Sequence, residues 1–280
     1  MNLSDLQFLL KKYKISPNYL RGQNFLIDDT VLDQILAQAK VKKNELILEV
    51  GPGLGALTQR LLNLQAQVAA FEVDKSLEKP LLQLAGLNDK LELHWQDILS
   101  LTDGQWQDIM LLHQAKAYKV VANIPYYLTA KIIGKFILAK NQPESMTFLV
   151  QREVAERVVL HKQKHSLLSL SVAFYGQAVL GEIVNKNSFY PVPKVDSAIL
   201  HIKDLHVWDY QADEVFVWQL IHRGMVAKRK KLFNNLLSDP KIEKQRLADI
   251  FIKLQLDQNS RAEDLSTNDW IDLAKNLSSR

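Results

Sequence analysis

The stretch Leu46–Thr58, with the sequence LILEVGPGLGALT, decides the fold of this chain. An apolar run of strand length leads directly into Gly51, Gly53 and Gly55, and helix-forming residues follow at once. Glycine allows a sharp turn from strand to helix and lets the backbone approach a ligand where a Cβ atom would collide. A ligand held there lies against a helix N-terminus, at the sheet edge where open α/β sheets bind nucleotides. The stretch therefore predicts a nucleotide-type pocket.

The glycine spacing and the acidic residues after the next two predicted strands indicate which class of nucleotide ligand the pocket binds. The glycine spacing is GxGxG, whereas dinucleotide sites carry GxGxxG, and tight turns also need glycine for purely structural reasons. Glu72 follows Gly51 by 21 positions, where an acid accepts hydrogen bonds from two ribose hydroxyls. The alternative role for Glu72, capping the next helix, suits Asp74 better. Asp97 ends the third strand and is suited to accept from the adenine amino group of a cofactor.

Short apolar runs alternate with longer segments of helical periodicity, a pattern typical of a parallel sheet with crossover helices. The predicted strands are Leu46–Val50, Val68–Glu72, Leu91–Trp95, Lys119–Ala122, Met146–Val150, Ala178–Val184 and Ser197–Ile202. The predicted helices are Thr30–Ala39, Ala56–Asn63, Ser76–Leu87, Ala130–Lys140, Glu153–Leu160 and Ser166–Tyr175. The connection between the last two strands is too short for a crossover helix, so these strands should pair antiparallel. We therefore expect a Rossmann-like α/β fold with a seven-stranded, mainly parallel sheet and an antiparallel last strand.

The sequence changes character after Lys203. Four helical segments follow, at Val215–Met225, Lys231–Leu237, Lys241–Leu254 and Asn268–Leu277. We therefore predict two domains, residues 1–203 and a small helical C-terminal domain of residues 204–280. Basic residues gather near both ends of the chain, at Lys11, Lys12, Lys14, Arg21, Arg223, Lys228, Arg229, Lys230 and Lys231. Such clusters are either solvated helix faces or phosphate-binding surfaces, and charge alone does not decide between them.

The composition excludes several classes of protein. The 280 residues are 47% hydrophobic, which excludes a disordered chain, and the net charge of +4 is only a mild bias. Cysteine is absent, so disulfides and thiolate metal sites are excluded. His161 and His165 have the i,i+4 spacing of metal ligands but no acidic residue between them, so we expect no metal. Neither a signal peptide nor an apolar run of membrane-spanning length is present, so we expect a cytoplasmic protein without membrane contact.

The end of the fourth predicted strand carries the motif Asn123-Ile124-Pro125-Tyr126. The N6 amine of adenine is a poor nucleophile because its lone pair is delocalised into the ring. If the Asn123 side-chain oxygen and the carbonyl of Ile124 or Pro125 accept its N–H groups, the lone pair is aimed at a sulfonium methyl group. Pro125 stiffens this turn, and Tyr126 would stack on a flipped or single-stranded base. The motif favours methyl transfer to adenine without a strong general base, the alternative being a strand-terminal turn with a buried tyrosine.

These residues resemble the ribosomal RNA adenine dimethyltransferase family, and most closely its small-subunit branch. The resemblance implies a class I methyltransferase fold and S-adenosylmethionine as cofactor. The heptapeptide at residues 22–28, GQNFLID, is similar to the N-terminal signature of the family, which implies that Asn24 and Leu26 contact the cofactor. The other residues expected to bind the cofactor are Gly51, Gly53, Glu72, Asp97 and Asn123.

The resemblance also implies a substrate. Residues 188–197, SFYPVPKVDS, are similar to a family loop in which Phe189 would close over the second face of the target adenine. With Asn123, Pro125 and Tyr126 it completes the expected catalytic residues. Residues 149–159 and 228–236 also resemble the family, whose C-terminal helices contribute to ribosomal RNA binding. The implied reaction is N6,N6-dimethylation of two adjacent adenosines near the 3′ end of small-subunit (16S) ribosomal RNA during ribosome biogenesis. The implied partners are this RNA and the assembling 30S subunit, and we expect a monomer.

Three departures from the family pattern bear on the site. Gln96 replaces the usual glycine before the acid, Tyr127 and Leu128 vary the commoner NLPYN, and His161–Ser169 lacks the usual Pro-Gly and Tyr-Gly features. Two alternatives stay open: the large-subunit branch associated with macrolide resistance, and an RNA-binding ribosome-assembly factor with little turnover. A nicotinamide dehydrogenase is disfavoured by the GxGxG spacing and by the lack of a His or Lys acid–base candidate near the strand ends.

Overall fold

The computed structural model describes residues 2–18, 22–159 and 164–278. Arg21, Leu160 and His161, which enter the predictions above, lie outside these ranges. The chain divides into two compact units, one made of Met1–Glu156 with Gln177–Leu205 and the other of Arg157–Gly176 with His206–Arg280.

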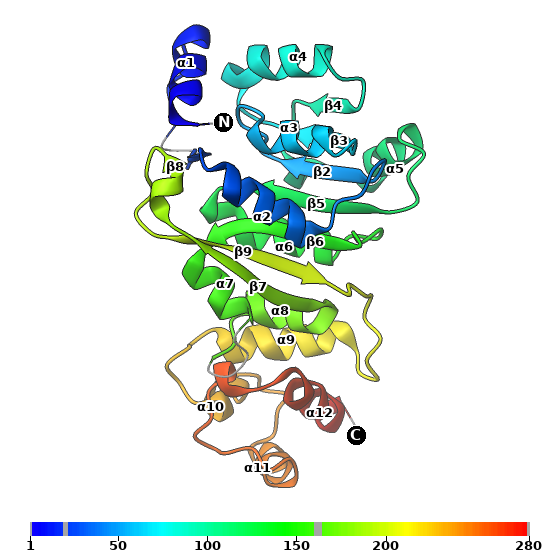
Figure 1. Ribbon diagram of the computed structural model, residues 1–280. Coiled ribbons are helices and arrows are strands. Elements are labelled where there is room, and N and C mark those ends of the chain that lie inside the picture. The colour runs from blue at the N-terminus through cyan, green and yellow to red at the C-terminus, as the bar shows by residue number, and fades with distance from the viewer. Residues whose placement is uncertain (1, 19–21, 160–163, 279–280) are drawn as a thin grey trace. The chain divides into compact units, whose positions relative to one another are not determined.

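The first unit is built on a seven-stranded sheet with the order β4-β3-β2-β5-β6-β9-β7 (Figure 1). Its strands are β2 (Leu46–Val50), β3 (Gln67–Phe71), β4 (Leu91–His94), β5 (Tyr118–Asn123), β6 (Ser145–Gln151), β7 (Gln177–Val184) and β9 (Ser197–Lys203). Strands β2 to β6 pair in parallel, and β9 runs antiparallel to both β6 and β7. The predicted mainly parallel sheet with an antiparallel last strand is therefore confirmed.

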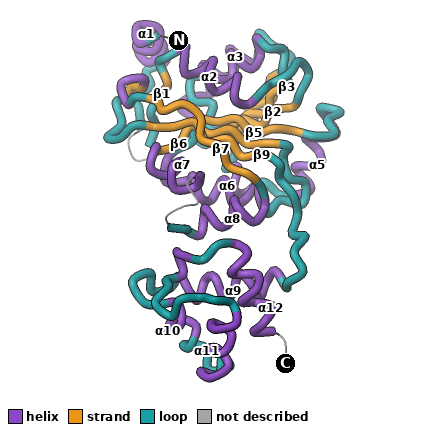
Figure 2. The backbone as a smooth tube through the Cα atoms, turned by 60° about the horizontal axis from the view of Figure 1, so that its bottom comes forward, coloured by secondary structure: helices purple, strands orange, loops and turns teal. Residues whose placement is uncertain are grey.

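Helices cover both faces of this sheet, because the central strands bury side chains on both sides. All five residues of β2 are buried. Figure 2 shows α2 and α3 on one face and α6 on the other. The helices of this part are α1 (Leu3–Tyr13), α2 (Asp29–Ala39), α3 (Ala56–Asn63), α4 (Glu78–Gly86), α5 (Asp103–Leu112), α6 (Thr129–Ile137) and α7 (Arg152–Val159).

Three elements were not predicted from the sequence. Helix α1 begins with a capping box between Asn2 and Asp5, and it packs beside α4. Helix α5 has only two buried residues, Trp106 and Ile109, and its sequence therefore lacks the apolar periodicity that predicts a helix. A separate two-stranded sheet joins β1 (Phe25–Leu26) to β8 (Phe189–Tyr190), strands too short for their pattern to stand out.

The second unit is helical, as predicted for the C-terminal part. Its helices are α8 (Leu167–Tyr175), α9 (Glu214–Met225), α10 (Leu232–Leu236), α11 (Lys244–Lys253) and α12 (Thr267–Ser278). The predicted boundary at residue 203 leaves α8 in the first domain, whereas the structure packs α8 against α9 and α12. The Phe174 ring of α8 explains this placement, since it lies 5.2 Å from the Trp208 ring and 5.6 Å from the Trp218 ring. Across the described ranges, the helices are too short or too polar to cross a membrane.

Candidate active site

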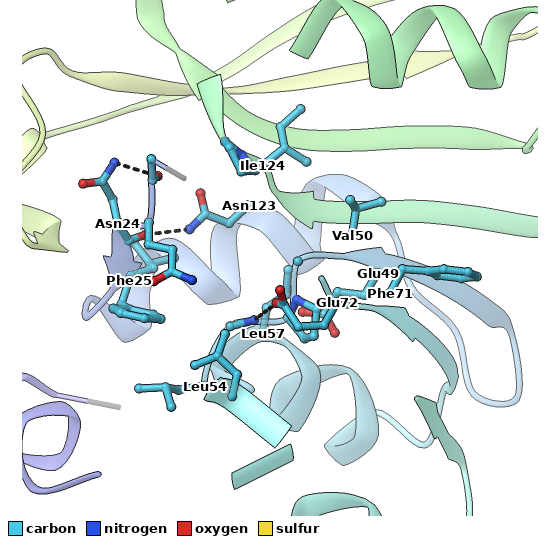
Figure 3. A pocket seen from close by; sticks show the side chains of 18 of the residues that line it. Asn24, Phe25, Glu49, Val50, Leu54, Leu57, Phe71, Glu72, Asn123 and Ile124 are labelled. Carbon is cyan, nitrogen blue, oxygen red and sulfur yellow. Dashed lines mark hydrogen bonds between the residues drawn. The ribbon is translucent and has the colours of Figure 1, made fainter. Parts of the chain in front are cut away.

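A cavity of about 360 Å³ lies where the carboxyl ends of four neighbouring strands meet. Its wall includes Gly51 after β2, Glu72 after β3, Asp97 after β4 and Asn123 at the end of β5. Parallel strands present their carboxyl ends at one edge, which brings together residues distant in sequence. The predicted residues that line the cavity are Asn24, Leu26, Gly51, Gly53, Glu72, Asp97, Asn123, Pro125 and Tyr126. Figure 3 shows several of them around the cavity.

The glycine turn leaves space for a ligand. Gly51, Gly53 and Gly55 have φ values of 68°, 62° and 82°, in the region that favours glycine. The Gly51 amide donates to the Phe71 carbonyl at 2.9 Å, which ties the turn to β3. A Cβ atom at Gly51 would meet no protein atom within 4 Å, whereas one at Gly55 would lie 2.8 Å from a Leu84 methyl carbon. Gly51 therefore keeps open space in the cavity, and Gly55 allows close helix packing.

The Glu72 carboxylate is held by the backbone around it. Its Oε1 accepts hydrogen bonds from the amides of Val73 and Asp74, each at 2.8 Å, and its Oε2 accepts from Gly53 at 3.4 Å (Figure 3). Burial raises the pKa of Glu72, and these amide donors oppose the rise. Because the carboxylate is fixed at the cavity wall with lone pairs to spare, it is able to accept from ligand hydroxyls.

A second carboxylate, Glu49, lies in the cavity wall and has no assigned role from the sequence. The side chain is 1% exposed within β2, and among the described residues no group lies in hydrogen-bonding geometry with its Oε2. Thr58 lies beside the carboxyl and favours its charged form. Burial raises the pKa of Glu49 to about 8, and the neighbouring Glu72 adds to this rise. At neutral pH the group is therefore mostly a protonated carboxyl, and a ligand that carries positive charge beside it would favour the carboxylate form. An acid inside the apolar run LILEV was the sequence feature that could have revealed it.

Asp97 and Gln96 form the wall at the end of β4. The Asp97 Oδ1 accepts from the Leu99 amide at 2.9 Å and so caps a short 3₁₀ turn, Ile98–Ser100. The Gln96 Oε1 accepts from the Gln105 side chain of α5 at 3.3 Å. The departure at Gln96 therefore adds a polar side chain to the cavity, one that α5 holds in place.

The Asn123 amide is oriented by the N-terminal segment. Its Nδ2 donates to the Asn24 carbonyl at 3.2 Å, and the Asn24 Nδ2 donates to the Gly22 carbonyl at 3.3 Å (Figure 3). Within the described ranges, no hydrogen bond reaches Asn123 Oδ1. The side-chain oxygen is therefore presented as an acceptor at the cavity wall.

Tyr126 is anchored beside it. Its hydroxyl lies 2.8 Å from Ser197 Oγ at the start of β9, and its carbonyl accepts from Thr129 Oγ1 at 3.0 Å. Burial raises the pKa of Tyr126, so the hydroxyl keeps its proton at neutral pH. Pro125, with φ of −56°, begins the 3₁₀ turn η4 (Tyr126–Leu128) that sets the direction of the ring.

Phe189 is the one expected catalytic residue that the structure does not place in the cavity wall. It pairs with Leu26 across the β1–β8 sheet and is 1% exposed in the hydrophobic core. Alternation along β8 directs Phe189 to this core, while Tyr190 packs against the cluster that contains Leu6. Closure of Phe189 over an adenine therefore requires movement of its ring and stays a prediction.

Helix α1 supplies a cavity residue that the sequence interpretation passed over. Leu6 lines the cavity and is fully buried, in a cluster with Phe25 and Leu54. The sequence feature that indicates this helix is the capping box of Asn2 and Asp5 followed by apolar residues at helical spacing. In the part of the chain that the structure covers, no group of His, Asp or Glu is arranged to hold a metal ion.

Comparison with known proteins agrees with this geometry. Residues 16–279 match the ribosomal RNA adenine dimethylase family. A protein of Dehalococcoides mccartyi (strain CBDB1), named ribosomal RNA small subunit methyltransferase A, is 37% identical over 263 residues, which is 94% of this chain and 89% of the relative.

Two solved structures share the fold. A dimethyladenosine transferase from Plasmodium falciparum aligns with a TM-score of 0.71 and 23% identity over 89% of this chain and 95% of that one. The 23S rRNA methyltransferase ErmE aligns with a TM-score of 0.69 and 24% identity over 91% of this chain and 100% of that one. Since the family match runs from before the GQNFL segment to the last helix, this chain belongs to the ribosomal RNA adenine dimethylase family.

Proposed function

We propose that this protein transfers methyl groups from S-adenosylmethionine to N6 of two adjacent adenosines near the 3′ end of small-subunit (16S) ribosomal RNA, which gives N6,N6-dimethyladenosine. One observation carries the proposal: the Asn123 amide nitrogen is held by the Asn24 carbonyl, and both Asn123 and Tyr126 line the same cavity. An acceptor in that position is what an exocyclic amine needs for orientation.

The residues of the cavity fit S-adenosylmethionine. The cofactor supplies a methyl group activated by a sulfonium, whose departure leaves a neutral thioether. Glu72 would accept from the ribose hydroxyls, Asp97 from the adenine amine, and the open space at Gly51 would admit the ligand close to the backbone. A positive group of the cofactor near Glu49 would favour the charged form of this buried carboxyl.

The target adenine would meet the Asn123-to-Tyr126 segment. Asn123 Oδ1 and the carbonyl of Ile124 or Pro125 would accept the two N6 hydrogens, and Tyr126 would stack on the base. Because Ser197 and Thr129 hold Tyr126 in place, little freedom is lost when the base binds. Orientation and electrostatics then provide most of the catalysis.

The small-subunit branch is the better assignment, because the relative at 37% identity is named for that subunit. The likeness to the 23S enzyme, at 24% identity, shows a common fold alone. We further propose that the helical C-terminal part binds ribosomal RNA, that the partner is the assembling 30S subunit, and that the protein acts in the cytoplasm as a monomer.

A methylation assay on 30S particles from a strain without this modification tests the proposal. Asn123→Ala should reduce the rate about 100-fold, as expected when a reacting group loses its orientation. Asn141→Ala, an exposed asparagine beyond α6, is the matched control and should leave the rate unchanged. Wild-type methylation by Asn123→Ala would refute the mechanism.

Two further measurements separate the alternatives. Primer extension on both ribosomal RNAs distinguishes the branches, since methylation of the large subunit would contradict the assignment. Calorimetry with S-adenosylmethionine distinguishes the enzyme from a binding factor, because a protein that does not bind the cofactor has no methyl donor.

A further inference from the structure

Tyr127 combines exposure with a place in the cavity wall. Its side chain lines the cavity, yet the residue is 63% exposed. Within residues 2–18, 22–159 and 164–278, it is the only aromatic residue with both properties; Phe8, at 64% exposed, does not line the cavity. An exposed aromatic ring in the wall of a cavity offers a flat face on which a base is able to stack.

The turn around Tyr127 directs neighbouring rings differently. Tyr126 and Tyr127 are successive residues of the 3₁₀ turn η4, in which side chains are spaced by roughly 120°. Tyr126 is tied to Ser197 by its hydroxyl, whereas the ring of Tyr127 stays exposed. The two rings therefore offer separate surfaces at one edge of the cavity.

Gly22 supports the Tyr127 ring. A Cβ atom at Gly22 would lie 3.7 Å from Tyr127 Cε1 and 3.8 Å from its Cδ1, so the glycine backbone passes close beside the ring. Gly22 has a φ of 63°, in the region that favours glycine. The neighbouring backbone thus limits the positions of the ring, which lowers the entropy lost when it binds a ligand.

A cation lies one helical turn further along. Lys131 is exposed in the first turn of α6, four residues after Tyr127, and η4 continues directly into this helix. Residues at this spacing share one side of a helix. In the described part of the chain, no hydrogen bond or ion pair engages the Lys131 ammonium group.

We propose that Tyr127 and Lys131 hold the nucleotide next to the target adenine, Tyr127 by stacking on its base and Lys131 by contacting its phosphate. An exposed ring with a nearby cation is the usual combination for single-stranded nucleic acid. The inference rests on the proposed function, because it takes the ligand of the cavity to be an adenine within RNA. It also gives a role to a position where the commoner family motif has asparagine.

Steady-state methylation of undermethylated 30S particles, at saturating S-adenosylmethionine, tests the stacking contact. Tyr127→Leu and Tyr127→Asn should raise the KM for the particles about 5- to 100-fold, the range for loss of one base–aromatic stack. Tyr127→Phe should retain the wild-type KM because the ring remains. Phe8→Leu, at the other exposed aromatic residue, should have no effect.

The salt dependence of particle binding tests the phosphate contact. Lys131→Gln should lower the slope of log K against log salt by about one. Lys140→Gln, at an exposed lysine beyond the same helix, is the matched control and should leave the slope unchanged. If Lys131 only stabilised the fold, Lys131→Gln would leave the slope of log K against log salt unchanged.

Each unfavourable result has a distinct meaning. A wild-type KM for Tyr127→Leu would overturn the proposal, and so would a weaker affinity for S-adenosylhomocysteine in place of a raised KM. An unchanged salt slope for Lys131→Gln would remove the phosphate contact and overturn the paired site. If the wild-type protein failed to methylate the particles, the proposed function itself would fall.

Discussion

Glu49→Gln should make the stability of the protein less dependent on pH. In the native protein, burial raises the pKa of the Glu49 carboxyl from its ordinary value of 4.5 to about 8. In the unfolded chain the carboxyl returns to its ordinary value. Between these two pH values the native state holds a proton that the unfolded state has released, so the free energy of unfolding falls as pH rises.

The size of the effect follows from the two pKa values. One pKa unit corresponds to about 1.36 kcal/mol, so the interval from 4.5 to about 8 costs the native state about 5 kcal/mol at alkaline pH. About 2 kcal/mol of this loss falls between pH 6 and pH 8. Glutamine has nearly the same shape and does not titrate, so this part of the pH dependence should disappear in Glu49→Gln.

Urea unfolding of the wild type and of Glu49→Gln at pH 6, 7 and 8, without cofactor, measures the effect. The free energy of unfolding of the variant relative to the wild type should increase by about 2 kcal/mol from pH 6 to pH 8. Other titrating groups are common to both proteins and largely cancel. Glu182→Gln, at an exposed position of β7, controls for the loss of one carboxylate. Parallel pH profiles for Glu49→Gln and the wild type would refute the reasoning.

Three further sets of substitutions test the geometry of the site. Gly51→Ala should weaken S-adenosylhomocysteine binding about 10-fold or more by calorimetry, because the added Cβ enters the open space of the cavity. Gly55→Ala should mainly lower the free energy of unfolding, because its Cβ would lie 2.8 Å from a Leu84 methyl carbon. Ser197→Ala and Tyr126→Phe should each slow methylation about 5-fold, and their double variant should be no slower than either, since both remove one hydrogen bond. Glu72→Gln should weaken S-adenosylhomocysteine binding about 10-fold, because an amide nitrogen would then face backbone N–H donors; unchanged affinity would contradict the ribose role.

The sheet and most of the cavity wall were predictable because their determinants are local. The central parallel strands β2, β3 and β5 appear as short, mostly apolar runs, and polar residues follow each run. Since parallel topology brings such ends to one edge, Glu72, Asp97 and Asn123 could be placed together from their positions alone. The glycine turn was also predictable from local sequence, because its positive φ values favour glycine at residues 51, 53 and 55.

What could not be predicted depends on contacts between distant segments. The apolar composition of α8 indicates a buried helix but not its partner, and the contact of Phe174 with Trp218 assigns it to the second unit. Phe189 was expected in the cavity by its position in a motif, yet pairing of two short strands directs its ring to the core. Motif position therefore identifies a residue without fixing the direction of its side chain.

Glu49 shows that the sequence holds more information about the site than its motifs do. Glu49 lies in a strand whose five residues are all buried. Burial of an acidic side chain raises the free energy of the folded state, and apolar packing does not compensate for this cost. Such violations of local rules are expected at functional sites, where a ligand provides the missing partner. The positive φ values of Gly51, Gly53 and Gly55 are a second departure from the usual local pattern, at the same sheet edge. Departures from the buried-strand pattern therefore indicate candidate site residues in a sequence, Glu49 among them, and the pH dependence of Glu49→Gln tests whether burial raises the pKa of this carboxyl.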